Sequence, residues 1–98
     1  MPMFHVEVHR SGPEWDFSKP LEGQSGWEAH ARFMDDLVDA GFLVLGGPLD
    51  DEIRVVHAIE AQSEEAVRST LENDPWHDSH LRIHSIDGWT IRLDSTKR

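Results

Sequence analysis

The spacing of hydrophobic residues along the chain predicts four strands. Residues 4–9 alternate strictly between apolar and polar side chains, which is typical of a strand with one buried face. Residues 53–60 and 81–86 are rich in aliphatic side chains, and a short apolar run at 42–45 ends at Gly-Gly-Pro, so we expect a strand in each. Glycine, proline and polar residues fill positions 10–25 and predict a long loop.

Two further segments have the spacing of helices. Between residues 27 and 40 apolar side chains recur every three or four positions, with Ser25 before them as a candidate N-cap. Gly41 follows as a residue suited to the left-handed backbone that ends many helices. A second helix is predicted after Ser63, with two glutamates in its first turn, and Pro75 ends it. The order β-α-β-β-α-β predicts an α+β fold of the ferredoxin-like type with an antiparallel sheet.

A chain of 98 residues has the size of one domain, so we expect residues 1–98 to form a single unit. Both helices of this arrangement cover the same face of the sheet. Alternation along the strands predicts a mixture of polar and apolar side chains on the other face, and the polar ones are His5, Glu7, His9, His57, Arg82 and His84. Four tryptophans are also many for so small a core. Together these features favour a symmetric homodimer in which two sheets enclose a partly polar cavity, with an open solvated sheet as the alternative.

The composition excludes several classes of partner. Nineteen acidic and nine basic residues give a net charge of −10, which argues against a nucleic-acid partner because phosphate binding depends on clustered lysine and arginine. No stretch approaches the roughly 20 apolar residues of a membrane span, so we expect no membrane partner. The chain has no cysteine and its N-terminus lacks the layout of a signal peptide, so we expect a cytoplasmic location.

A histidine-rich run at residues 77–84 is the candidate metal site. His77, His80 and His84 all lie within it. On a strand, His80 and His84 would share a face but lie about 13 Å apart along the chain. One ion cannot bridge that distance unless the segment is helical or a second strand contributes, so we predict no metal site here. Phosphate-binding glycine loops are also missing, and we expect no cofactor.

Three segments in a fixed order carry a family resemblance. They are the helical segment His30–Gly41, the apolar segment Phe42–Leu49 with its Gly-Gly-Pro turn, and the Asp-Pro-Trp turn at Glu72–Trp76. This set resembles the YCII-like (YciI-related) family, whose members are small ferredoxin-like domains that form dimeric α/β barrels. The resemblance implies a catalytic pair, a histidine on the first helix and an aspartate in the Asp-Pro turn, at the positions of His30 and Asp74.

The resemblance implies a small-molecule enzyme that uses this pair for general acid–base catalysis. An aspartate that accepts a hydrogen bond from a histidine fixes the tautomer of the ring and raises its basicity. We expect lyase, isomerase or dehydrochlorinase-like chemistry on a small organic or aromatic compound. A ligand-binding or interaction domain without catalysis is the alternative, as is a cofactor-free monooxygenase of the same fold. His30 and Asp74 also have purely structural interpretations, as a partly buried histidine and as a turn residue.

Five further residues are candidates for substrate binding. Trp76 follows the Asp-Pro turn and is expected to form a wall of the site, although it could equally fill the core beneath the second helix. Gly47 and Pro48 end a strand where the backbone can approach a ligand closely. His5 and His57 are expected to contribute from the sheet face that the helices leave uncovered.

Overall fold

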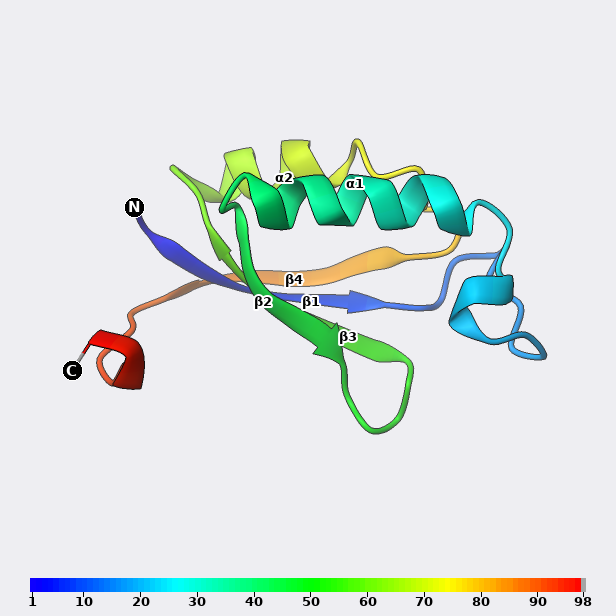
Figure 1. Cartoon of the computed structure of the whole chain (residues 1–98), viewed down its shortest axis with the longest axis horizontal. Helices are drawn as coiled ribbons and strands as arrows, with labels where there is room; N and C mark the ends of the chain where they lie inside the picture. Colours follow the sequence, from blue (N-terminus) through cyan, green and yellow to red (C-terminus); the bar gives the residue numbers. More distant parts are fainter. Residues whose placement is uncertain (98) are drawn as a thin grey trace.

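The computed structural model describes residues 1–97 and contains an antiparallel sheet with both long helices on one face (Figure 1). The elements are β1 (Met3–His9), η1 (Leu21–Gly23), α1 (Trp27–Asp39), β2 (Leu43–Pro48), β3 (Arg54–Glu60), α2 (Glu64–Leu71), β4 (Arg82–Trp89) and η2 (Ser95–Lys97). The four strands are ordered β2-β3-β1-β4, and each neighbouring pair is antiparallel. This order and these two helices are those of the predicted ferredoxin-like α+β class.

The ends of two helices follow the sequence signals. The Ser63 hydroxyl accepts a hydrogen bond from the Ala66 amide at 3.1 Å and caps α2 as predicted. Gly41 has a φ of +76°, so it adopts the left-handed conformation expected after α1. No helix within residues 1–97 is both long enough and apolar enough to cross a membrane.

The predicted cap of α1 by Ser25 is wrong. Gly26 is the N-cap residue, with a φ of +74°, and no side chain caps this helix. Ser25 instead makes two long-range contacts: its hydroxyl lies 2.9 Å from His80 Nε2, and its carbonyl accepts a hydrogen bond from Trp76 Nε1 at 2.8 Å. Ser25 therefore forms tertiary contacts and does not cap α1, the role that its local sequence position predicted.

The register of the sheet corrects the position of His57. Residues directly opposite each other on neighbouring strands share a face. Val6 is fully buried, and it lies opposite His57 of β3 and Ile86 of β4. His57 therefore faces the helices, and its predicted place on the uncovered face is wrong. Alternation defines two faces for β3, but aliphatic residues occur on both, so the pattern did not identify the buried one.

A bulge in β4 places His84 and Ile86 on opposite faces of the sheet, although simple alternation along the strand would put them on the same face. Glu7 lies opposite Ser85 and Val8 lies opposite Ile83, so His84 is the extra residue between the two pairs. The extra residue reverses the alternation, which leaves Ile83 and Ile86 both beside the residues that face the helices. The strand also extends beyond the predicted end at residue 86, since β4 continues through Gly88 to Trp89.

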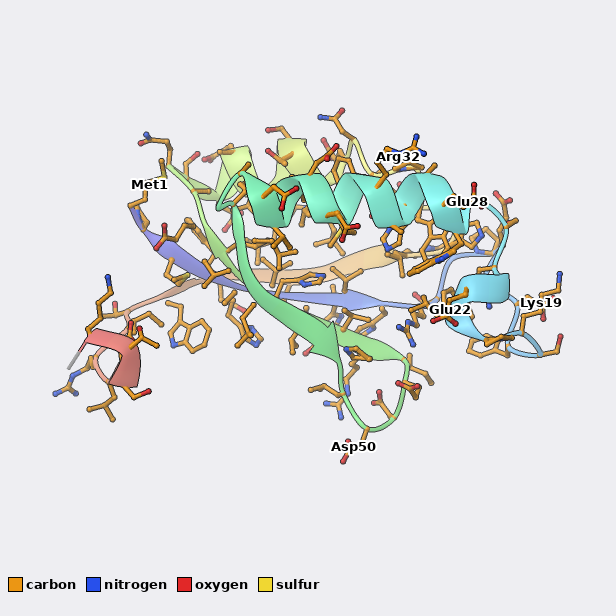
Figure 2. The ribbon with its side chains drawn as sticks, in the orientation of Figure 1. Met1, Lys19, Glu22, Glu28, Arg32 and Asp50 are labelled. Carbon is orange, nitrogen blue, oxygen red and sulfur yellow. The ribbon has the colours of Figure 1, made fainter. Side chains whose placement is uncertain are left out.

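The core lies between the two helices and the helix-facing side of the sheet. Its buried members are Phe4, Val6, Val8, Ile59, Ala61, Val67, Leu71 and Ile86. Within residues 1–97 no layer covers the other side of the sheet, and Figure 2 shows side chains that project below it. Two large apolar residues lie there exposed, Leu45 at 74% and Trp89 at 45%. The ring of His5 meets Trp89 edge-on, with the ring centroids 5.7 Å apart.

Candidate active site

His30 and Asp74 are in direct contact. His30 lies on the buried side of α1, and Asp74 lies in the turn that follows α2. The Nδ1 atom of His30 is 2.8 Å and 3.0 Å from the two carboxylate oxygens of Asp74. A carboxylate can only accept, so this hydrogen bond assigns the proton to Nδ1. The contact is the one that the predicted pair requires, and it leaves Nε2 of His30 as the free acceptor.

The turn after α2 fixes the direction of the Asp74 carboxylate. Oδ1 of Asp74 also accepts a hydrogen bond from the backbone amide of Trp76 at 2.8 Å. The backbone amide of Asp74 in turn donates to the carbonyl of Leu71, at the last residue of α2. The Asp74 carboxylate therefore both stabilises the turn and accepts the hydrogen bond from His30.

Trp76 is both a core residue and a wall of the site. It is 1% exposed, and its ring is stacked on His30 with centroids 4.0 Å apart and planes 8° apart. His80 stacks within 4.7 Å of the Trp76 ring. The indole also donates to the carbonyl of Ser25, so all of its polar capacity is used within the fold. Trp76 is therefore buried and also lies against His30, so the position in the core and the position beside the pair do not exclude each other.

The long loop between β1 and α1 closes this end of the molecule. Trp15 meets the Trp76 ring edge-on at 5.7 Å, and Trp27 approaches the same ring at 5.9 Å. Gln24 is buried, and its amide bonds to both the backbone N–H and the carbonyl of Asp16. The loop is therefore held in place over the tryptophans.

A cavity of about 160 Å³ lies beside the pair, between the helices and the sheet. Its apolar lining residues are Val8, Leu21, Trp27, Met34, Val55, Leu71, Trp76, Leu81 and Ile83. Its polar lining residues are Arg10, His30, His57, Asp74 and His77. A cavity of roughly 150 Å³ holds a molecule the size of benzene. The lining therefore suits a small, mainly apolar molecule that meets polar groups at a few points.

His57 supplies a neutral imidazole to this cavity. Its pKa is lowered to about 4, mainly by burial and secondly by the nearby His30, while Asp74 opposes the shift. Within residues 1–97 its Nδ1 has no hydrogen-bond partner. Gly46 lies opposite His57 on β2, and a β-carbon at that position would overlap Nδ1. Gly46 therefore makes room for the imidazole of His57.

The other predicted binding residues lie elsewhere. His5, Gly47 and Pro48 line a separate recess of about 400 Å³ beside Trp89, toward the uncovered face, and His57 borders both spaces. The sequence placed all of these residues in one dimer cavity. The structure separates His5, Gly47 and Pro48 from the His30–Asp74 pair, because the pair and Trp76 lie on the side of the sheet that the helices cover.

Arg10 is a site residue that the sequence analysis missed. It is 7% exposed and lines the cavity. Its Nη1 donates to the carbonyl of Glu52 at 2.9 Å, and its guanidinium lies 5.0 Å from the centre of the Trp15 ring. The signal was present in the strand pattern, because Arg10 continues the alternation of Val6 and Val8 on the buried face. Arg10 itself lies directly after the last residue of β1, His9.

The histidines of residues 77–84 do not converge on one point. His80 is buried against Trp76 and bonds to the hydroxyls of Ser25 and Ser79. His77 contacts the Asp78 carboxylate at 3.3 Å, and His84 lies beside Glu7 on the uncovered side of the sheet. The three therefore have separate surroundings.

Comparison of the chain with protein-family models, with curated proteins and with solved structures finds no match. The resemblance to the YCII-like family therefore depends on the three sequence segments, and it stays a hypothesis.

Replacing Trp76 by alanine tests its place in the core. We expect Trp76→Ala to lower the free energy of unfolding by roughly 3–5 kcal/mol, because a large buried aromatic side chain leaves a cavity. Urea denaturation would measure this change. Phe17→Ala is the matched control, because this aromatic side chain is 73% exposed, and we expect its effect to stay at about 0.5 kcal/mol. Equal effects of the two substitutions would contradict the assignment of Trp76 to the core.

The buried His57 predicts a loss of stability in acid. Its folded pKa of about 4 lies below the ordinary value of 6.5, so the unfolded chain takes up the proton first as the pH falls. Its contribution is intact above pH 6.5 and is lost progressively towards pH 4. Between pH 7 and pH 5 we expect a decrease of roughly 2 kcal/mol in the free energy of unfolding from this residue.

The measurement is urea denaturation at both pH values for the wild type and for His57→Gln, which cannot titrate in this range. A decrease of the same size in both proteins would show that His57 does not cause the loss.

Proposed function

We propose that this protein is a small-molecule enzyme in which His30 acts as general acid and base and Asp74 positions it. The observation that carries this proposal is the hydrogen bond from His30 Nδ1 to a fixed carboxylate on the wall of an apolar cavity. Because the bond occupies Nδ1, the lone pair on Nε2 is available for a proton. No residue within 1–97 forms a hydrogen bond with Nε2 of His30 that would compete for it.

The proposed chemistry is a proton transfer coupled to elimination or isomerisation. Nε2 of His30 removes a proton from the substrate, and the electrons of the broken bond form a double bond. In an elimination a leaving group departs with its electron pair, and in an isomerisation the proton returns at another atom. The Asp74 carboxylate stabilises the imidazolium that forms between the two steps. This chemistry requires no cofactor.

The cavity favours a planar, mainly apolar substrate with one anionic group. The walls are aliphatic and aromatic, and the stacked ring of Trp76 continues the surface beside His30. Arg10 contributes a guanidinium group to this lining. Within residues 1–97 only its Nη1 atom forms a hydrogen bond, so its remaining N–H groups are available to a carboxylate or a phenolate of the substrate. A proton-removing enzyme benefits from such a contact because negative charge develops on the substrate.

The family resemblance supports the same class of reaction. Related YCII-like proteins include an enzyme that removes chloride from a hydroxylated aromatic. Chlorinated and hydroxylated aromatic acids and phenols are therefore the first compounds to test.

The test is turnover of such a panel, followed by chloride release and by ultraviolet absorbance. We expect His30→Gln to lower kcat/KM for a processed compound by about 10²–10⁴-fold, because the base is lost. Asp74→Asn should cause a decrease of similar order, since the amide can stabilise the wrong tautomer. His5→Gln is the control, because His5 lies outside the His30 cavity, and it should leave the rate unchanged.

Full activity of His30→Gln, with the fold confirmed by circular dichroism, would refute the proposal. Binding of panel compounds without turnover by the wild type would favour the alternative, a ligand-binding domain.

We also propose that two copies pair through the uncovered sheet face to give the dimeric barrel that the family resemblance implies. Leu45 and Trp89 are exposed there, and the recess between them is lined by Val56 and Ala58. Both helices lie on the opposite face, so no element of the same chain covers these side chains (Figure 1). Burial of this apolar surface is the driving force for pairing.

Light scattering at micromolar concentration should give twice the 11.2 kDa of one chain. We expect Leu45→Glu to shift the protein to the monomer, because the charge would be buried at the interface. Val38→Glu is the matched control, since Val38 is 52% exposed on α1 and away from this face. A wild type of 11.2 kDa would rule out the dimer.

A further inference from the structure

A second group of chemically active side chains lies on the uncovered face of the sheet. It consists of Glu7, His9 and His84, and it is separate from the cavity beside His30. Glu7 and His9 are alternate residues of β1, so they share a face. The bulge in β4 adds His84 next to them.

The ligand atoms of the three side chains lie close together. Nε2 of His9 lies 2.6 Å from Oε2 of Glu7, and Nε2 of His84 lies 3.8 Å from the same oxygen. The rings of His9 and His84 are stacked, with centroids 4.3 Å apart and planes 13° apart. One ligand atom from each residue lies within 4.8 Å of the other two.

We propose that Glu7, His9 and His84 bind a divalent transition-metal ion such as Zn²⁺. Two imidazole nitrogens and one carboxylate oxygen are the donors that such ions prefer, whereas Mg²⁺ and Ca²⁺ prefer oxygen alone. Bond lengths of about 2.0–2.1 Å to a tetrahedral zinc place its ligands about 3.3–3.5 Å apart. The distances of 2.6 Å and 3.8 Å lie on either side of that range, and the two stacked rings must turn out of their parallel arrangement before both nitrogens point at one ion.

The charge of the group also suits a cation. Two neutral imidazoles and one carboxylate give the site a charge of −1, in a chain with a net charge of −10. Arg54 and Arg82 lie opposite His9 on the neighbouring strands and oppose this effect. Asp51 balances the first of them, with an oxygen 2.6 Å from Arg54 Nε.

The metal would replace the proton that His9 now shares with Glu7. His9 would then carry its proton on Nδ1 and coordinate through Nε2, so metal binding releases a proton when the ring is charged. The side chain of His84 is 56% exposed in the single chain, so one side of the group faces solvent there and would face the cavity between the two sheets in the proposed dimer. Three protein ligands and an open position for water are the arrangement of reactive rather than structural zinc sites.

The test is titration of the full chain, without a histidine tag, with Zn²⁺ by calorimetry and with Co²⁺ by visible absorption. We expect one ion per chain, no binding of Mg²⁺, and tighter binding of Zn²⁺ than of Co²⁺. His84→Ala and Glu7→Gln should each weaken Zn²⁺ binding at least tenfold. His5→Ala is the matched control, because it removes a histidine from the same strand and face without touching the group.

Two results would overturn the proposal. One is a failure of the wild type to bind Zn²⁺ or Co²⁺ at millimolar concentration. The other is binding that survives His84→Ala but is lost when His77 is replaced, because the ion would then lie in the histidine-rich run. His84 is exposed, so its replacement should leave the fold intact, which circular dichroism would verify. None of these results depends on the activity proposed for His30.

Discussion

The Asp74 carboxylate is the group on which the arrangement of the site depends. It accepts hydrogen bonds from His30 Nδ1 and from the backbone amide of Trp76, which come from distant parts of the chain. The first bond connects α1 to the turn after α2, and the second sets the start of the segment that carries the Trp76 ring. Because this ring stacks on His30, each of the three residues His30, Asp74 and Trp76 contacts the other two. Displacing any one of these groups displaces the others, so the position of the imidazole is determined by three contacts.

The bulge between β1 and β4 separates the two faces of the molecule chemically. Without the extra residue, His84 and Ile86 would stay on the same side of β4, since alternate residues share a face. With it, Ile86 is buried beneath the helices and His84 joins Glu7 on the other side. A single local irregularity therefore completes the core and places a third polar group beside Glu7 and His9.

Much of the fold could be predicted from the sequence because its signals are local. The alternation at β1, the helical spacing after residue 26 and the cap at Ser63 are set by neighbouring residues, and each matches the structure. The contact between His30 and Asp74 followed from the family resemblance and would not have followed from spacing. Local patterns could not give the buried face of β3 or the bulge in β4, because both depend on which residues of β1 lie opposite. The contacts of Ser25 could not be predicted for the same reason, since its partner Trp76 lies far away in the sequence. Arg10 differs, because its place on the buried face continues the local alternation of Val6 and Val8.

The lack of a side chain at Gly46 makes this position and His57 energetically dependent on each other. An added methyl group at position 46 would overlap the imidazole, so in the present chain it must displace His57 or the strand beneath it. The same methyl group would fill empty space if residue 57 were small. Effects of substitution at two positions in contact are not additive, and here the sign of the effect at one position is set by the other. A larger residue at position 46 therefore requires a smaller residue at position 57. Glycine has to stay at position 46 for as long as the neutral imidazole of His57 borders the cavity.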